Sequence, residues 1–237
     1  MAPIASRGVD VEHRISELLR PHAASLKTRR RQQLPLIFRN SETVYVVCSG
    51  LLALNASLPG RRRLVLGLIY PGDVFRAAFA PALANLALVT VSASNVLRLR
   101  GRQIEEMLQT EPELAQVLCD QLSKQQARIA LRVATIGFLT SEGRVSAFLI
   151  ELALRLGWST FEGIAFDIPL TRADIAAYLA LNPDTISRQI SRLKEIGILQ
   201  QWGRGRVIIR DWAALKRECE IAEALQKLYG RDPAEAS

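Results

Sequence analysis

The stretch that most limits what this chain can fold into is 170–199, LTRADIAAYLALNPDTISRQISRLKEIGIL, which has the pattern of two short helices joined by a turn. Thr171 is of a residue type that caps helices, and apolar positions recur after it at helical spacing. These positions are Ile175, Ala176 and Leu179. Leu181, Asn182 and Pro183 then end the first helix, because Asn tolerates turn geometry and Pro suits the first turn of a new helix.

The second predicted helix has an apolar side and a polar side. Its apolar side carries Ile186, Ile190 and Leu193. Its polar residues, most of them near the N-terminal end, are Asp184, Thr185, Ser187, Arg188, Ser191 and Arg192. Because helix-turn-helix proteins insert that end of the second helix into the major groove, the stretch predicts a reader of specific DNA sequences. Two alternatives stay open here: a helical hairpin that only packs, and a protein-interaction module without specific DNA binding.

Residues 200–210, QQWGRGRVIIR, predict a β-hairpin directly after the two helices. A Gly-Arg-Gly turn lies between two short β-like runs, which is the pattern of the wing in a winged helix. Arg204 and Arg206 at the tip of this hairpin are placed to contact DNA phosphates.

The charge of the chain gives this interpretation modest support. The formal net charge is +8, but residues 1–139 hold 18 Lys and Arg against 10 Asp and Glu, whereas residues 140–211 hold 9 against 8. Within the second part, six cations and two acidic residues fall between 184 and 210, which is the local focusing that a phosphate-contacting surface needs. The DNA prediction therefore rests on the motif.

Composition and motifs bound the remaining function classes. No apolar run approaches the roughly 20 residues of a membrane span, and the N-terminus lacks the apolar core of a secretion signal. Cys48, Cys119 and Cys219 form no CxxC pair, which is typical of free thiols, so we expect a cytoplasmic protein without membrane contact. No P-loop, dinucleotide fingerprint, GxSxG elbow or metal-ligand cluster is found, so we expect neither an enzyme nor a metal site.

The expected fold class is α+β, beginning with a poorly structured or partly helical lead-in over 1–33. From 34 to 110 the chain changes to short β-like runs separated by turns such as Tyr70-Pro71-Gly72-Asp73. These runs are Leu34–Phe38, Thr43–Val47, Leu51–Leu54, Leu64–Ile69, Leu88–Val91 and Val96–Leu99. Short strands at this spacing predict a small sandwich or barrel.

Three further parts are predicted after residue 110: a long helix over 111–138, the DNA-reading domain over 139–211, and a C-terminal helix and tail over 212–237. The first helix of the DNA-reading domain is predicted at Ser141–Leu156. The long helix, started by Pro112, carries an apolar stripe that steps by three or four residues, apart from a gap filled by Gln125 and Gln126. This stripe consists of Leu114, Leu118, Leu122, Ile129, Val133 and Ile136.

Such a stripe predicts a coiled-coil homodimer, because apolar residues at this spacing form one face of a helix. A dimer is also favoured because a single reading head would bury too little DNA surface for tight specific binding. The alternative, that the stripe packs only on the chain's own β domain, stays open.

This order of parts resembles the Crp/Fnr family of bacterial transcription regulators, which join a β-roll of the cyclic-nucleotide-binding type to a dimerisation helix and a winged helix. The residues that carry the resemblance are Tyr45–Gly50, Tyr70–Asp73, Thr171–Ala176 and Asp184–Arg188, within a span of roughly 40–211. The resemblance implies double-stranded DNA, a second copy of the chain and RNA polymerase as partners.

The second helix is similar to that of the Fnr/FixK branch, whose signature is Glu-x-x-Ser-Arg, with Asp184 here at the acidic position. The resemblance implies that Arg188 reads guanine, that Ser187 contacts the thymine side of the half-site, and that Asp184 accepts from a cytosine or adenine amino group. It implies TTGAT half-sites in an inverted repeat, although Asp is one methylene shorter than Glu and shifts selectivity at the base pair it faces. The expected phosphate contacts are Thr171, Arg172, Thr185, Ser191, Arg192, Arg204 and Arg206.

The resemblance to the Crp/Fnr family implies no particular effector. Members that respond to cyclic AMP carry a Gly-Glu turn followed by an Arg-Ser pair, whereas residues 72–91 hold neither, and Arg76 is their only cation. No cysteine precedes Cys48 to hold an iron–sulfur cluster, so neither cyclic AMP nor a cluster is expected. Haem ligation by His13 or His22 and a redox role for Cys48 stay open. So does the alternative function, a regulator gated by haem, redox or another small molecule with a different operator. We expect a regulator without a cofactor, controlled by its own synthesis.

Overall fold

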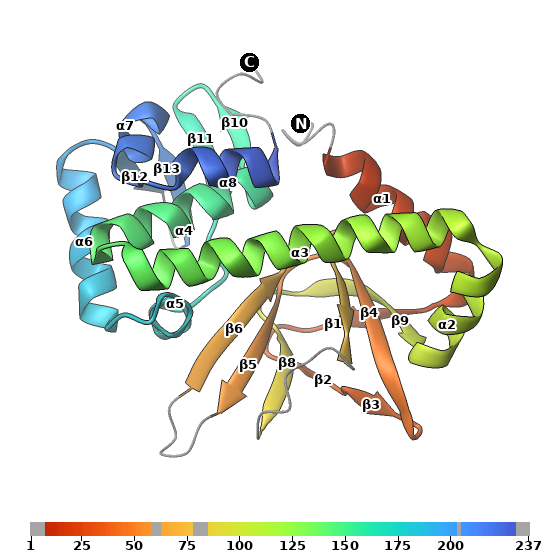
Figure 1. Cartoon of the computed structure of the whole chain (residues 1–237). Coiled ribbons are helices and arrows are strands. Elements are labelled where there is room, and N and C mark those ends of the chain that lie inside the picture. The colour runs from red at the N-terminus through yellow and green to blue at the C-terminus, as the bar shows by residue number, and fades with distance from the viewer. Residues whose placement is uncertain (1–7, 58–62, 78–84, 203–204, 231–237) are drawn as a thin grey trace. The chain divides into compact units, whose positions relative to one another are not determined.

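The computed structural model describes residues 8–57, 63–77, 85–202 and 205–230 (Figure 1). The fold is α+β, as predicted, and the chain divides into two compact units. One unit is Val9–Gln125, and the other is Gln126–Ser237 together with Met1–Gly8. The long helix α3, Pro112–Phe138, belongs to both, because the boundary falls within it.

The first unit is built around two antiparallel β-sheets. One sheet has the order β1-β9-β4-β3, with β7 also paired to β4, and the other has the order β2-β8-β5-β6. The first sheet consists of β1 (Ala24–Thr28), β3 (Ile37–Phe38), β4 (Ser41–Ser49), β7 (Val74–Arg76) and β9 (Ser94–Arg100). The second consists of β2 (Gln33–Leu34), β5 (Leu52–Ser57), β6 (Arg63–Ile69) and β8 (Leu86–Thr90). Together they form the predicted β-roll.

Side chains alternate between the two faces of the first sheet, and each face buries its own apolar core. The core between the two sheets contains Leu34, Tyr45, Val47, Leu52, Ile69, Phe75, Leu88 and Val96. The other face packs against α1 (Gly8–Leu19), α2 (Gly101–Thr110) and the start of α3, and a short 3-10 turn, η1 (Arg20–His22), follows α1. This second core contains Ile15, Leu19, Val44, Val46, Val74, Leu97, Leu99, Ile104, Met107, Leu114 and Val117.

The predicted turn at 70–73 is confirmed. Gly72 has a φ of +84°, a conformation that glycine adopts without steric cost. The Asp73 N–H donates to the Tyr70 carbonyl at 3.0 Å, and the Asp73 carboxylate accepts from the Tyr70 N–H at 2.9 Å. The Gly72 N–H donates to the Val47 carbonyl at 2.8 Å, which ties the turn to β4.

The predicted start of the β domain at residue 34 is wrong. Within the expected lead-in, α1 is helical, but β1 is a strand that pairs along its whole length with β9. The segment ASLKT escapes sequence recognition because it holds one β-branched residue and a lysine, as edge strands often do. The predicted strand 34–38 is two short strands, β2 and β3, because Pro35 cannot donate to a ladder. Strand β7 has no predicted counterpart.

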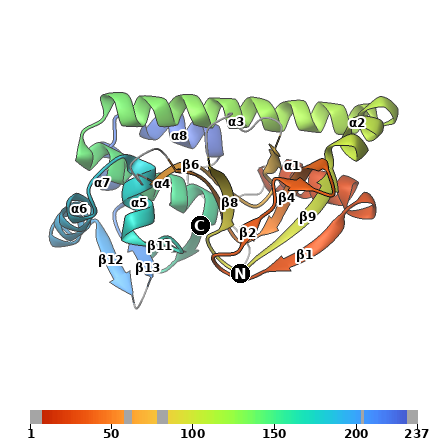
Figure 2. The same cartoon turned by 90° about the horizontal axis from the view of Figure 1, so that it is seen from below.

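The second unit contains the rest of α3 and a compact helical domain with a small sheet (Figure 2). The predicted helix Ser141–Leu156 is confirmed as α4, capped by Thr140, whose hydroxyl accepts from the Gly143 N–H at 3.2 Å. The following elements are β10 (Trp158–Thr160), β11 (Gly163–Asp167), α5 (Arg172–Leu179), α6 (Pro183–Glu195), β12 (Leu199–Trp202), β13 (Arg206–Ile209), α7 (Trp212–Arg217) and α8 (Ala222–Tyr229).

The predicted wing is confirmed as the β12–β13 hairpin, and it belongs to a four-stranded sheet of order β10-β11-β13-β12. Figure 2 shows α5 and α6 beside this sheet. The sequence pattern predicts one helix after residue 212, whereas the structure has two, α7 and α8. The long apolar α4 supplies much of the core on which these elements pack.

Candidate DNA-binding surface

The first helix of the pair, α5, begins at a capping box. The Thr171 hydroxyl accepts from the Asp174 N–H at 3.1 Å, and the Asp174 carboxylate accepts from the Thr171 N–H at 3.0 Å. The Thr171 hydroxyl also donates to the same carboxylate at 2.7 Å. This hydroxyl, which the sequence assigns to a phosphate contact, is therefore already engaged in the cap, whereas the neighbouring Arg172 side chain is exposed.

The turn between α5 and α6 forms as its sequence predicts. Ala180 adopts a left-handed conformation with φ of +52°, and the Leu181 N–H donates back to the Ala176 carbonyl at 3.0 Å. Asn182 then caps α6 by accepting from the Asp184 N–H at 2.9 Å, and Pro183 fills the first helical position, where no donor is needed. The turn fixes where the N-terminal end of α6 points.

Two arginines hold the C-terminal end of α5 against the helices behind it. Arg132 of α3 donates to the Tyr178 carbonyl at 3.0 Å, and Arg144 of α4 donates to the Leu179 carbonyl at 3.4 Å. Both carbonyls lie in the last turn of α5, where intrahelical donors run out. The Arg132 guanidinium also lies 4.5 Å from the centre of the Tyr178 ring. These residues position the helix-turn-helix, and sequence reasoning missed them because no local pattern marks them.

A buried carboxylate joins three helices of the same unit. Glu151 of α4 accepts from the Tyr178 hydroxyl at 3.0 Å and from the Tyr229 hydroxyl of α8 at 3.4 Å. Burial, and then the negative charge of Glu151, raise the pKa of Tyr178 well above its usual value, so this phenol stays a donor. The carboxylate thereby ties α5 and α8 to α4.

The recognition helix α6 buries one side and exposes the other. Ile186 and Leu193 are buried and Ile190 is partly buried, whereas Asp184 and Arg188 are exposed near its N-terminal end. Arg188 contacts only its own helix among the described residues, donating to the Thr185 hydroxyl at 3.3 Å.

Three other polar side chains of α6, Ser187, Gln189 and Arg192, have partners. Ser187 donates to the Pro183 carbonyl at 3.1 Å, so its hydroxyl has to rotate before it can donate to a base. Gln189 donates to Glu142 of α4 at 2.8 Å, which adds a polar contact to the buried side. Arg192 pairs with Glu218 at 2.7 Å, and this hydrogen bond raises the pKa of Arg192.

The wing arginine is paired as well. Arg206 forms two hydrogen bonds with Asp167 of β11, at 3.0 and 3.4 Å, and these raise the pKa of Arg206. Its guanidinium lies 5.2 Å from the centre of the Trp158 ring. Arg204, the other predicted wing contact, lies outside the described residues. Of the sequence-predicted phosphate contacts, Arg192 and Arg206 therefore already have carboxylate partners.

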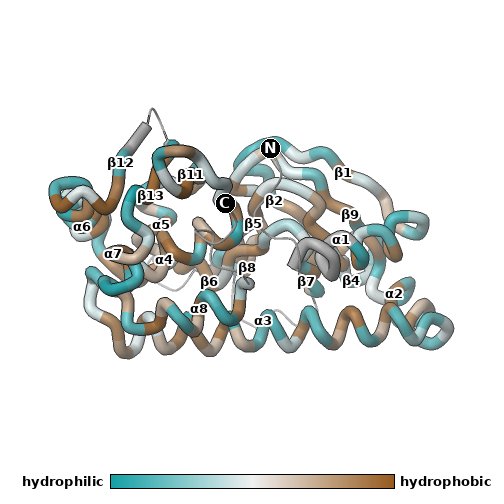
Figure 3. Tube along the Cα trace, turned by 90° about the horizontal axis from the view of Figure 1, so that it is seen from above, coloured by the Kyte–Doolittle hydropathy of each residue, from teal (hydrophilic) through white to brown (hydrophobic). Residues whose placement is uncertain are grey.

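The stripe predicted on α3 divides into two parts. Apolar and polar residues alternate along this helix (Figure 3). Leu114 is fully buried in the chain's own core and Leu118 packs partly against it, so Leu114 is not available to a partner. Farther along, Leu122, Ile129 and Val133 are 44%, 65% and 65% exposed, and Ile136 is partly exposed. Three large apolar side chains open to solvent on one helix are unusual for a monomer.

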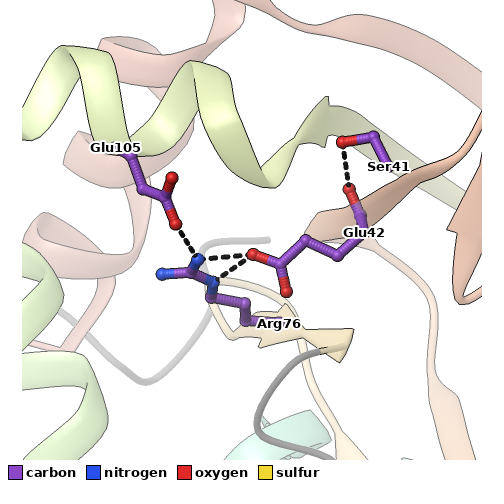
Figure 4. A network of polar contacts seen from close by, with 4 residues as sticks. All are labelled: Ser41, Glu42, Arg76 and Glu105. Atoms are coloured by element: carbon purple, nitrogen blue, oxygen red, sulfur yellow. Dashed lines mark hydrogen bonds and ion pairs between the residues drawn. The ribbon is translucent and has the colours of Figure 1, made fainter.

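Arg76, the only cation between Gly72 and Val91 in the sequence, is already paired (Figure 4). It donates to Glu42 of β4, from Nε at 2.7 Å, and to Glu105 of α2, from Nη2 at 2.6 Å. It follows Val74 on the face of β7 that packs against the helices, not on the face between the sheets. The Arg76 guanidinium is therefore engaged by two carboxylates of the protein itself.

Comparisons with known proteins agree with this geometry. A family model described as the Crp-like helix-turn-helix domain matches residues 143–218. The nitrogen fixation regulation protein FixK of Azorhizobium caulinodans is 31% identical over 228 residues, covering 86% of this chain and 89% of that protein. The chain belongs to the Crp/Fnr family. It is thus a DNA-binding transcription regulator of the Fnr/FixK branch and not an enzyme, as the sequence predicted.

Other members of the Crp/Fnr family are similar over most of the chain. The transcriptional activator protein FnrL of Cereibacter sphaeroides is 29% identical over 179 residues, covering 73% of this chain and 71% of that protein. The solved structure of FixK2 from Bradyrhizobium japonicum shares the fold with a TM-score of 0.71, at 24% identity over 83% of this chain and 97% of that one. A CooA mutant from Carboxydothermus hydrogenoformans gives a TM-score of 0.70 at 17% identity, covering 86% of this chain and 94% of that one.

In the described part of the chain, no helix is long and apolar enough to cross a bilayer.

Proposed function

We propose that this Crp/Fnr regulator works as a homodimer that reads an inverted repeat of TTGAT-like half-sites with α6. The observation that carries the proposal is the exposed pair Asp184 and Arg188, one turn apart at the N-terminal end of a helix whose other side is buried. The relatives' names, FixK and FnrL, belong to the branch whose signature this helix resembles.

Each base-reading residue has a chemical role. The planar fork of Arg188 can donate to O6 and N7 of guanine together, which lysine cannot do in the same geometry. Ser187 faces the thymine side of the half-site after its hydroxyl turns away from Pro183. The Asp184 carboxylate accepts from an exocyclic amino group of cytosine or adenine, one methylene farther away than a glutamate would.

The phosphate contacts fix the position of α6 on the DNA duplex but do not distinguish one base sequence from another. The N-terminal amides of α5 and the exposed Arg172 side chain grip one phosphate, since helix N-termini favour anions. Thr185 and Ser191 flank the reading residues on α6. Arg192 and Arg206 contribute by exchanging a carboxylate, the partly buried Glu218 and the exposed Asp167 respectively, for a phosphate oxygen. This exchange has a small cost because ion pairs near the surface stabilise by about 0–1 kcal/mol.

Dimerisation is assigned to the second part of α3. Leu122, Ile129, Val133 and Ile136 step by three, four and seven residues along one face, which matches a coiled-coil seam. A second copy of the same helix covers this face with identical residues, as a two-fold interface requires. Two reading heads then contact two half-sites.

We further propose that DNA binding needs no small-molecule effector. The pairing of Arg76 with Glu42 and Glu105 supports this, because the protein's own carboxylates supply the charge that a cyclic phosphate would bring. Contact with RNA polymerase at the promoter is part of the same proposal.

Fluorescence anisotropy of the purified, ligand-free protein tests the reading head. A TTGAT-N4-ATCAA duplex is compared with a scrambled duplex at about physiological salt, and we expect binding to the first to be tighter by about 10³-fold or more. Equal weak binding would contradict the effector-free TTGAT reading. Random-site selection with and without cell extract then separates a shifted operator, caused by Asp184, from a missing effector.

A further inference from the structure

The core between the two sheets ends in a polar cluster that the DNA-binding surface does not use. In the β4–β9 ladder, Val47 lies opposite Val96, Tyr45 opposite Arg98, and Thr43 opposite Arg100. Residues opposite each other in a ladder share a face, so the apolar core gives way along one face to hydroxyl and guanidinium groups. The arginine cluster defined here consists of Phe38, Arg39, Thr43, Tyr45, Arg98 and Arg100.

The cluster is positively charged, and no described carboxylate pairs with its three arginines. Arg98 is partly buried, and its guanidinium lies 3.9 Å from the centre of the Phe38 ring, while that of Arg39 lies 5.4 Å from the same ring. Arg39, Arg98 and Arg100 have no carboxylate partner among the side chains that the structure describes. On the opposite face of the same sheet, Arg76 has two carboxylate partners, Glu42 and Glu105. The lack of such partners is therefore specific to the face that carries the arginine cluster.

The cluster also holds a buried hydroxyl with only a weak partner. Thr43 is 1% exposed, and its Oγ1 forms no hydrogen bond of good geometry with a described residue, although, against the rise that burial causes, a hydrogen bond from it to Tyr45 lowers the pKa of that phenol. The Tyr45 phenol is itself committed, donating to the Pro35 carbonyl at 2.8 Å. A buried hydroxyl whose hydrogen bond is poorly aligned gains from a ligand that accepts its proton in better geometry.

Backbone geometry adds a third observation. Arg39 and Asn40 form the β3–β4 turn with φ of +48° and +58°, a left-handed conformation that costs free energy for a residue with a side chain. This turn brings Arg39 to the Phe38 ring that Arg98 also contacts. The stacked ring limits how the Arg98 fork can turn, which pre-organises its donors.

We propose that the arginine cluster binds a small oxyanion, a phosphoryl or carboxylate group, with Arg98 as the main donor, Arg39 and Arg100 at its rim, and the Thr43 hydroxyl beneath. Charge-assisted bonds from a planar guanidinium are the strongest that such a ligand finds. The site is separate from Arg76 and rests neither on the operator nor on dimerisation.

Isothermal titration of the full-length protein with inorganic phosphate and with citrate, at constant ionic strength, tests this site. Wild type is compared with Arg98→Ala, with Thr43→Val, which keeps the shape and all charges, and with Arg102→Ala as the matched control. Arg102 is an exposed arginine of α2 in the same unit, paired with Glu106 at 2.9 Å, so its loss changes the net charge equally. Arg98→Lys keeps the charge and removes the fork, which covers the case in which the alanine variant does not fold.

We expect one site per chain, an affinity at least tenfold lower in Arg98→Ala, a severalfold loss in Arg98→Lys and Thr43→Val, and a change within twofold in Arg102→Ala. Tighter binding of phosphate than of citrate identifies a phosphoryl ligand, and the reverse identifies a carboxylate. Absence of binding by either probe at millimolar concentration would overturn the proposal. So would an equal loss in Arg98→Ala and Arg102→Ala, because general charge would then account for it.

Discussion

Replacing Ile129 and Val133 together by alanine tests whether the exposed part of α3 is the dimer seam. Both side chains are 65% exposed in the single chain. Complete burial of such a side chain contributes about 1.5–3 kcal/mol, so covering the exposed part contributes about 1–2 kcal/mol each. Two residues on each of two protomers give about 4–8 kcal/mol, of which the methyl groups left by alanine retain about a third.

The remaining loss of about 3–5 kcal/mol corresponds to a dimer dissociation constant raised by about 10²- to 10⁴-fold. The helix itself should persist, because alanine has a higher helix propensity than isoleucine or valine. Sedimentation equilibrium over a dilution series measures the constant, and circular dichroism checks the helix content.

Ile37→Ala is the matched control for this pair. Ile37 is 69% exposed on β3, so its substitution removes a similar apolar area away from α3. We expect the dimer constant of this variant to stay within twofold of wild type. A change of less than fivefold in Ile129→Ala/Val133→Ala, or one no larger than in the control, would refute the assignment of the seam.

Three further predictions concern the DNA-binding unit. Arg188→Ala should weaken binding to the TTGAT duplex by about 1–3 kcal/mol and leave scrambled DNA nearly unchanged, measured by anisotropy; an equal loss on both would make Arg188 a phosphate contact. Asp184→Glu should tighten binding to the same duplex, because it restores the branch signature, and a loss in that titration would contradict the register. Tyr178→Phe should lower the free energy of unfolding by about 1.5–3 kcal/mol in urea, since the buried Glu151 loses its 3.0 Å donor. Tyr229→Phe removes a 3.4 Å bond to the same carboxylate and should cost less, so a larger loss in Tyr229→Phe would contradict this ordering.

The helix-turn-helix could be predicted from sequence because its signals are local. Thr171 and Asp174 form the capping box three residues apart, and Asn182 and Pro183 stop one helix and start the next. Strand β1 could not be predicted in the same way, because its place depends on pairing with β9, some seventy residues later. The β propensities of its residues do not predict such an edge strand, because its stability comes from pairing with the neighbouring strand.

The electrostatic state of the site is the part that sequence alone misses. Arg206 meets Asp167 across 39 positions, and Arg192 meets Glu218 across 26, so no motif window contains either pair. The same holds for Arg132 and Tyr178, which are 46 positions apart. A motif indicates which side chains a helix presents, whereas the fold decides which of their charges are already compensated.

This compensation bears on how the protein separates its operator from other DNA. Attraction to any phosphate backbone grows with the number of cations that release counterions, about 0.9 ions per neutralised phosphate. Arg192 and Arg206 have to exchange a carboxylate before they contact a phosphate, so each contributes somewhat less to sequence-independent binding than an unpaired arginine would, and the DNA-reading segment is nearly neutral as a whole. Base contacts then account for a larger share of the affinity difference between operator and other DNA, because they form only on the matched site. The difference in affinity between operator and scrambled DNA should therefore depend on Asp184, Ser187 and Arg188 more than on the charge of the surface around them.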